Sequence, residues 1–165
     1  MAGLRPAFDK DGTITAANAS TINDGASAVV VCSREFADKH GLKPMAKILS
    51  CGIHAQAPEW FTTAPVEAMK KALKKANLNP NDIDLWEVNE AFAVVALAAA
   101  KGVEIPESKL NIHGGGISLG HPIGSSGSRI LTSLLYAMQA KGAKRGLGSL
   151  CIGGGEGIAM VVEKV

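Results

Sequence analysis

The sequence predicts an α/β domain built on a mixed five-stranded sheet with helices on both faces. Apolar stretches rich in β-branched residues alternate with segments whose apolar residues recur every three or four positions. A glycine turn joins the last two apolar stretches, which makes the final strand antiparallel to the one before it. Because the 165 residues are 47% hydrophobic, enough for one core, residues 1–165 are expected to form a single domain.

Five short apolar runs bounded by turn residues are expected to be the strands of this sheet. The first run follows the turn signal Asn23-Asp24-Gly25 and is typical of a buried strand, and the last two form the closing hairpin. The five strands cover residues 26–32, 43–51, 83–88, 147–152 and 158–162.

Helices are expected between these strands. Ser33 is a favourable N-cap and Gly41 a C-terminal stop, which predicts a short helix over residues 34–40. Pro65 suits a first helical turn, and the stretch that it begins carries apolar residues on one face and four lysines on the other. Two further helices are expected over residues 90–101 and 126–141, whereas residues 58–63 are expected to be irregular.

Composition argues against several classes of protein. A net charge of +2 without a long basic run does not indicate a nucleic-acid footprint. The longest apolar run, residues 91–100, is half the roughly 20 residues that cross a bilayer. The N-terminus lacks a signal-peptide pattern, so a cytoplasmic chain is expected. Three widely spaced cysteines without a CxxC pair predict no disulfide framework and no metal site, even though His54 follows Cys51 closely.

The first segment that could carry chemistry is Asn89-Glu-Ala-Phe-Ala93, where a predicted strand leads into a helix. Strand ends of α/β sheets are common places for binding and catalytic residues. Asn89 is either the N-cap of the following helix or a carboxamide that donates to a developing oxyanion, directly or through a water.

The second segment, residues 113–129, is rich in glycine and contains His121 between Gly120 and Pro122. It lacks the lysine of a phosphate-binding P-loop and does not meet the GxGxxG pattern. The proline holds His121 extended just ahead of a predicted helix, whose N-terminal dipole favours a neutral imidazole. His121 is therefore a candidate general base, and the alternative is a loop histidine bonded to backbone carbonyls.

The third segment is Cys151-Ile-Gly-Gly-Gly-Glu-Gly157, a thiol near a strand end followed by a glycine turn. Successive glycine N–H groups can bind an oxyanion and can stabilise a nearby thiolate. The alternative is a cysteine that fills the core, which is also the interpretation of Cys32 and Cys51.

Taken together, these three segments closely resemble the C-terminal half of the thiolases, and most closely their biosynthetic acetyl-CoA acetyltransferases. The resemblance includes Leu4-Arg-Pro-Ala-Phe-Asp9 and Gly12-Thr-Ile-Thr-Ala-Ala-Asn-Ala-Ser20 and covers essentially the whole chain. It implies a thiolase-like C-terminal half as the fold. It also implies formation or cleavage of a carbon–carbon bond between two acyl-CoA units through an acyl-cysteine intermediate.

The resemblance assigns roles to individual residues. His121 matches the histidine that activates the nucleophilic cysteine and, with a water bound by Asn89, holds the thioester oxygen. Cys151 matches the cysteine that moves the α-proton, and the N–H of Gly153 matches part of the oxyanion hole. Ser20 matches a serine that contacts the pantetheine arm of coenzyme A, and Phe92 a residue of the pocket wall.

The same resemblance implies no cofactor and no metal, because the coenzyme A thioester is a substrate. The implied partners are acyl-CoA substrates, an N-terminal thiolase half in cis or in trans, and further copies of the full enzyme. Neither Cys32 nor Cys51 matches the motif of the nucleophilic cysteine, which lies in the N-terminal half of thiolases. The chain alone is therefore expected to be inactive.

Two other functions remain open at this stage. One is a non-catalytic acyl-CoA-binding or assembly module, and the other is a thioesterase that uses Cys151 and His121. Thr21 and Glu156 replace residues that are usually smaller or uncharged in thiolases. Either replacement is expected to alter how the acyl group or coenzyme A fits the site.

Overall fold

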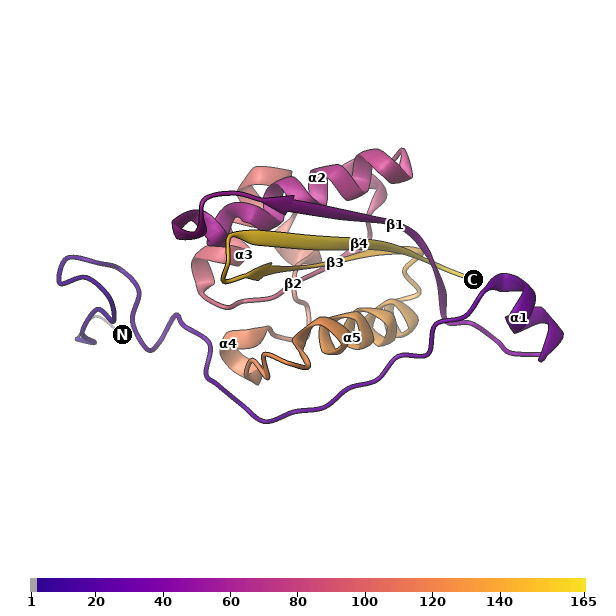
Figure 1. Cartoon of the computed structure of the whole chain (residues 1–165), viewed down its shortest axis with the longest axis horizontal. Helices are drawn as coiled ribbons and strands as arrows, with labels where there is room; N and C mark the ends of the chain where they lie inside the picture. The colour runs from indigo at the N-terminus through magenta and orange to yellow at the C-terminus, as the bar shows by residue number, and fades with distance from the viewer. Residues whose placement is uncertain (1–2) are drawn as a thin grey trace.

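The computed structural model describes residues 3–165, which form a four-stranded mixed sheet in the order β1-β4-β3-β2 (Figure 1). The strands are β1 (Ala46–Ala55), β2 (Leu85–Val88), β3 (Arg145–Ile152) and β4 (Glu156–Lys164). β2 and β3 are parallel, whereas β4 is antiparallel to both β3 and β1. The mixed α/β class and the closing hairpin are confirmed, but the prediction of five strands is wrong.

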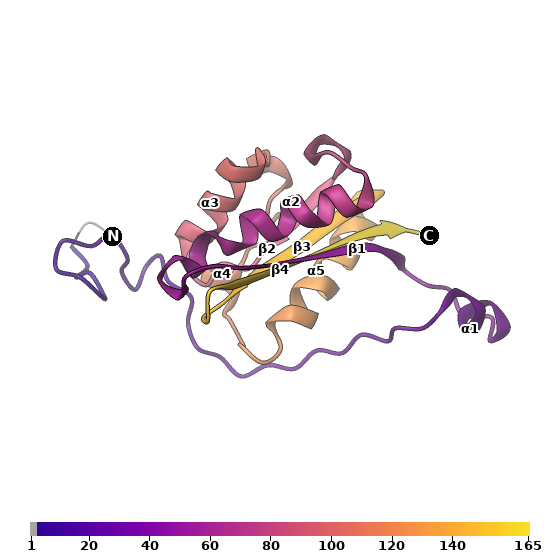
Figure 2. The same cartoon turned by 45° about the horizontal axis from the view of Figure 1, so that its top comes forward.

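The strand predicted over residues 26–32 does not join the sheet. This segment is extended but pairs with no strand within residues 3–165, and Val30 is 93% exposed. It runs along α5 (Ser126–Lys141), away from the sheet (Figures 1 and 2), and Ser27 is hydrogen-bonded to Ser125 and Ser128 beside the start of that helix. Its β-branched composition is suited to a strand, but a strand also needs a neighbour that supplies backbone hydrogen bonds.

Helices cover both faces of the sheet, as predicted. Figure 2 shows α2 (Ala64–Ala76) and α3 (Ala93–Val103) on one face, with α5 and the short α4 (Gly116–Leu119) on the other. The larger apolar cluster lies under α2 and α3 and includes Met69, Trp86 and Val95, while a smaller one lies under α5. Three short 3-10 helices complete the described chain, namely η1 (Pro58–Thr63), η2 (Pro80–Asp82) and η3 (Glu107–Lys109).

The helix boundaries follow local signals with two exceptions. Ser33 accepts a hydrogen bond from Phe36 N as the N-cap of α1 (Arg34–Lys39), and Gly41 has the positive φ of 62° expected at a helix end. By contrast, residues 58–63 form η1 instead of irregular chain. The helix expected from residue 90 begins at Ala93, because Phe92 is extended and bridges to Ala19 in the N-terminal segment.

Glycines allow α2 to lie directly against the sheet. A Cβ on Gly52 of β1 would come within 2.1 Å of Ala68 O and 2.6 Å of Ala72 N. A Cβ on Gly157 of β4 would come within 2.5 Å of the carbonyl carbon of Ala64. Since both obstacles are backbone atoms, the close packing of α2 on β1 and β4 requires glycine at these two positions.

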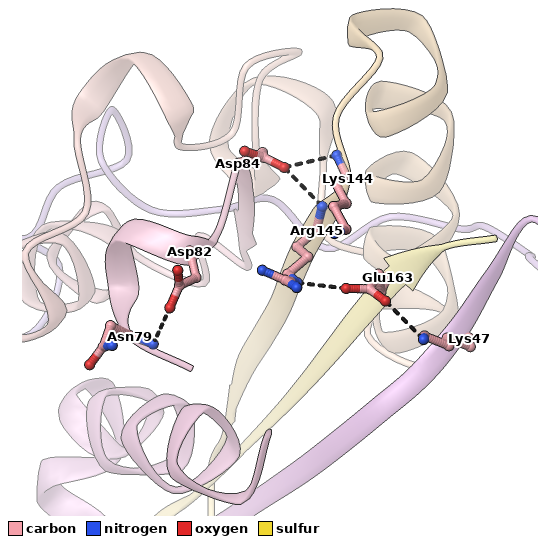
Figure 3. A network of polar contacts seen from close by, with 7 residues as sticks. All are labelled: Lys47, Asn79, Asp82, Asp84, Lys144, Arg145 and Glu163. Carbon is pink, nitrogen blue, oxygen red and sulfur yellow. Dashed lines mark hydrogen bonds and ion pairs between the residues drawn. The ribbon is translucent and has the colours of Figure 1, made fainter. Parts of the chain in front are cut away.

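A polar network joins the strands at the edge where β2 and β3 begin (Figure 3). Asp84 Oδ2 accepts hydrogen bonds from Lys144 N (2.8 Å) and Arg145 N (2.9 Å). Glu163 accepts from Arg145 Nε at 2.7 Å and pairs with Lys47 at 2.8 Å. These two hydrogen bonds lower the pKa of Glu163 to about 2, so the carboxylate stays charged and links β1, β3 and β4.

One carboxyl group lies inside the fold. Glu87 on β2 is 5% exposed and shares its face of the strand with Leu85, which packs in the cluster under α5. Burial raises the pKa of Glu87 to about 7, although the charge of Arg129 acts in the opposite direction.

Within residues 3–165, no helix combines the length and the apolar character that crossing a bilayer requires.

Replacing Gly52 with alanine should destabilise the fold, because the new methyl group has to displace the backbone of α2. We expect a loss of about 1–3 kcal/mol in the free energy of unfolding, measured by urea denaturation. Gly127→Ala is the matched control, since a Cβ there meets no atom within 4 Å and alanine is the better helix former. Equal stability of Gly52→Ala and the parent chain would contradict the close packing.

Replacing Glu87 with glutamine should change how stability depends on pH. Between the unfolded value of 4.5 and the folded value of about 7, the folded state holds a proton that the unfolded state has lost. Raising the pH through this window therefore destabilises the parent chain, by up to about 3 kcal/mol, but not the variant. Unfolding at pH 4 and pH 8 should show Glu87→Gln gaining relative stability at the higher pH.

Glu67→Gln is the control for this prediction. The hydrogen bond from Lys70 lowers the pKa of Glu67, so its removal should have a small effect of opposite sign. An unchanged difference between Glu87→Gln and the parent chain at the two pH values would show that Glu87 is not a buried, protonated group.

Candidate active site

Three of the sequence-predicted residues lie at the carboxyl edge of β2 and β3. The parallel register pairs Val88 with Ser149, and Asn89 N donates to Ser149 O at 2.9 Å. Asn89 therefore leaves β2 beside the last residues of β3, which include Cys151. His121, from the loop between α4 and α5, reaches the same edge, where its Nε2 lies 3.3 Å from Asn89 Nδ2.

The hydrogen bonds around His121 have a defined direction. The Asn89 amide nitrogen can only donate, so His121 Nε2 accepts and is unprotonated. In a neutral imidazole the proton is then on Nδ1, which lies 2.6 Å from Ser126 Oγ. Ser126 in turn donates to Pro122 O at 3.0 Å. The arrangement selects the neutral Nδ1–H tautomer and leaves Nε2 as the basic atom.

Burial acts on both titratable groups of the site. It lowers the pKa of His121, and the positive charge of Arg129 on α5 lowers it further. The expectation of a neutral imidazole is thus supported, although the physical cause is burial and a neighbouring guanidinium. Burial raises the pKa of Cys151, so this residue is a thiol at neutral pH, although glycine N–H groups follow it in the chain.

The backbone of His121 is held from both sides. Gly120 has a φ of 93°, and a Cβ there would come within 2.5 Å of Asn23 Oδ1. His121 N donates to Thr21 O at 3.2 Å and to Asn23 Oδ1 at 3.0 Å. The glycine and the N-terminal segment together fix the direction in which the imidazole leaves the loop.

The segments that carry Ser20 and Phe92 lie side by side, because Ala19 forms a β-bridge with Phe92. Ser20 Oγ donates to Ala91 O at 2.9 Å. The Phe92 ring makes edge-on contacts with Phe8 and Phe61, with ring centroids 5.8 and 6.2 Å apart. Phe92, not Asn89, occupies the N-cap position of α3, so the interpretation of Asn89 as a helix cap is wrong.

The glycine turn after Cys151 is open. Gly153 is exposed, and a Cβ there would meet no atom within 4 Å. Glu156 follows the turn, and its carboxylate lies against Gly154. Within residues 3–165 the buried Oε2 of Glu156 has no hydrogen-bond partner. The backbone at Gly153 is therefore accessible to a bound molecule.

The structure brings some predicted residues into contact and leaves others apart. Asn89 and His121 are hydrogen-bonded to each other, and Ser20 donates to the carbonyl of Ala91, the residue before Phe92. In the described part of the chain, the Cys151 thiol makes no hydrogen bond to either partner, although it lies at the same edge of the sheet. Among residues 3–165, no group of three or more His, Cys, Asp or Glu side chains is placed to hold a metal ion.

Sequence reasoning missed Ser126 and Glu90 as parts of this site. Ser126 could have been found as the hydroxyl that follows His121 by about one helical turn at the start of a helix. Glu90 had been interpreted through the dipole of the helix that follows it, whereas its carboxylate faces the loop that leads to His121.

Two family models and several relatives match this chain. A model described as the thiolase C-terminal domain matches residues 42–164, and one described as the thiolase N-terminal domain matches residues 1–35. The acetyl-CoA acetyltransferases of Chromobacterium violaceum and Escherichia coli K12 are 54% and 52% identical to 99% and 100% of this chain. The chain spans 42% of the length of each.

Solved structures show the same fold. Human mitochondrial 3-ketoacyl-CoA thiolase in complex with CoA superposes on 99% of this chain with a TM-score of 0.96 and 45% identity. The acetyl-CoA acetyltransferase of Bacillus anthracis also gives a TM-score of 0.96, at 43% identity over 99% of this chain, and the chain covers 42% of each of the two. With a C-terminal-domain model that matches most of its length, this chain belongs to the thiolase family.

Proposed function

We propose that this chain is the C-terminal part of an acetyl-CoA acetyltransferase that condenses or cleaves acyl-CoA units through an acyl-cysteine. The observation that carries the proposal is the directed hydrogen-bond series from Asn89 through His121 to Ser126, at the strand edge that also holds Cys151. Such a set supplies a base, an acid and oxyanion donors, but not the nucleophile.

In this proposal His121 acts as the base that activates the nucleophilic cysteine. The Nε2 of its neutral imidazole carries no proton. It can accept the proton of an approaching thiol when the Asn89 N–H that it accepts in this chain turns to the thioester oxygen or to a water. The imidazolium that forms can then donate to the thioester oxygen. Asn89 Nδ2 donates beside the same nitrogen, either to that oxygen or to a water that binds it.

Cys151 moves the α-proton of the acyl unit. Because burial raises its pKa, the thiol holds a proton at neutral pH and can deliver it to the carbanion formed when the carbon–carbon bond is cleaved. In condensation the thiol first gives its proton to a base, and the resulting thiolate accepts the α-proton, while the N–H of Gly153 helps to hold the oxyanion of the acyl-enzyme. Ser20 contacts the pantetheine arm of coenzyme A, Phe92 forms part of the pocket wall, and no metal or cofactor takes part.

The nucleophile is proposed to come from an N-terminal thiolase half, in cis or in trans. Cys32 is exposed in the segment before α1 and Cys51 lies within β1, so neither is at the carboxyl edge of β2 and β3. A cavity of about 740 Å³ between residues 28–48 and α5 is lined largely by apolar side chains. With exposed Val30 and Tyr136 nearby, this surface is suited to the missing half.

The test is reconstitution of thiolysis. The chain alone should not cleave acetoacetyl-CoA. Cleavage should appear when it is mixed with the N-terminal portion of the Chromobacterium violaceum relative, the part to which this chain has no counterpart. In the mixture, Cys151→Ala and His121→Ala should each lower kcat by about 10²–10⁴-fold, because each removes a proton-transfer group. Cys51→Ala is the matched cysteine control and should keep kcat within about twofold.

Three outcomes would contradict this assignment. Cleavage by the chain alone would show that it carries its own nucleophile. Coenzyme A binding by the mixture without turnover would favour the non-catalytic module. Release of coenzyme A from acetyl-CoA, abolished by Cys151→Ala, would favour the thioesterase.

Association with the N-terminal half should depend on the unpaired segment 26–32. Val30→Asp places a charge on a side chain that is 93% exposed here but would be buried in the complex. We expect it to weaken association by at least about tenfold, while the melting temperature of the isolated chain stays unchanged. Calorimetric titration against the same N-terminal portion measures this, with Val165→Asp as an exposed-valine control outside the segment.

A further inference from the structure

Glu90 links the two sides of the candidate site. It follows Asn89 directly, and its two carboxylate oxygens accept hydrogen bonds from different parts of the chain. Oε1 accepts from Asn111 Nδ2 at 2.9 Å, and Oε2 accepts from Ile117 N in the first turn of α4 at 3.2 Å. One side chain therefore connects the end of β2 to the loop that delivers His121.

Asn111 makes this link rigid. Its Oδ1 accepts from Val88 N at 2.8 Å, and its Nδ2 donates to Val88 O at 2.9 Å as well as to Glu90. Asn111 has a positive φ of 46°, which asparagine tolerates better than most residues. Val88, Glu90 and Asn111 are thus held together by side-chain and backbone hydrogen bonds of ordinary length.

The loop is shaped to let the carboxylate approach. A Cβ on Gly115 would lie 2.2–2.4 Å from the carboxyl atoms of Glu90, and one on Gly116 would lie 2.9 Å from Glu90 O. Because glycine stands at both positions, α4 begins directly on the Glu90 side chain. From there the chain reaches His121 after Gly120, so a shift of α4 moves the imidazole.

We propose that Glu90 is a positioning residue that sets the distance between Asn89 and His121 by fixing α4 against the end of β2. The proposal rests on the catalytic roles of Asn89 and His121 given above. It assigns Glu90 no contact with substrate and no proton transfer. Glutamine cannot replace it, because its amide nitrogen is a donor and would face either the donor Asn111 Nδ2 or the donor Ile117 N.

The first experiment observes the imidazole directly in the 165-residue chain. Nitrogen NMR of the histidine side chains at neutral pH, with His121→Gln to assign the signal, reports which ring nitrogen is protonated. The parent chain should show His121 as the Nδ1–H tautomer alone. Glu90→Gln should show a mixture of both tautomers, and amide exchange at Ile117 should be at least about tenfold faster.

Ser118→Ala is the matched control in the same loop. Ser118 exchanges hydrogen bonds with Gly115 at 3.2 Å but does not reach β2, so its removal should leave the His121 tautomer unchanged. If Glu90→Gln loses protection at Ile117 yet keeps the pure Nδ1–H tautomer, Glu90 only holds the loop and the proposal is wrong. Retained protection at Ile117 would also overturn it.

The second experiment measures kinetics in the mixture described under the proposed function. Glu90→Gln should lower kcat by about 10- to 100-fold, as expected for a misplaced catalytic group, with KM for acetoacetyl-CoA changed less than about twofold. A raised KM with unchanged kcat would contradict the proposal. If the unmodified mixture has no activity, the proposed function fails, and the tautomer measurement still decides the role of Glu90.

Discussion

The candidate site depends on the fact that a carboxamide nitrogen can only donate a hydrogen bond. From Asn89 Nδ2 the direction of each following bond is determined: Nε2 of His121 accepts, Nδ1 donates to Ser126, and Ser126 donates to Pro122 O. Reversing any one of these bonds would place two donors or two acceptors against each other. The tautomer of the imidazole is therefore a property of the fold, because the end of β2 and the start of α5 are both held by the sheet.

Much of the fold could be predicted from local signals. Ser33 and Gly41 determine the ends of a helix through their own backbone and side-chain chemistry, and the glycine turn after Cys151 determines a hairpin. The segment at 26–32 could not be placed in this way. Its composition describes a strand, but pairing depends on a partner that no local pattern in this chain identifies.

The sequence could predict which residues form the candidate site, but not the hydrogen bonds that place them relative to one another. Asn89, His121 and Cys151 stand out because each residue type sits next to a strand end, a proline or a glycine turn. Their mutual placement comes from contacts between residues far apart in the sequence, such as Asn23 with His121 and Glu90 with Ile117. The sequence left open whether Cys151 is a thiolate beside glycine N–H groups or a cysteine that fills the core. The structure places it in the core, where burial raises the pKa of its thiol.

The extended segment 26–32 also affects how the isolated chain behaves in concentrated solution. Its backbone N–H and C=O groups make no ladder with any strand in residues 3–165, and its apolar, β-branched side chains are mostly exposed. Such a stretch is a template on which identical segments of other molecules can stack into intermolecular sheets. Handling this polypeptide by itself therefore carries a built-in tendency to aggregate. The neighbouring α1 gives no net charge that would oppose it, because Glu35 and Asp38 balance Arg34 and Lys39.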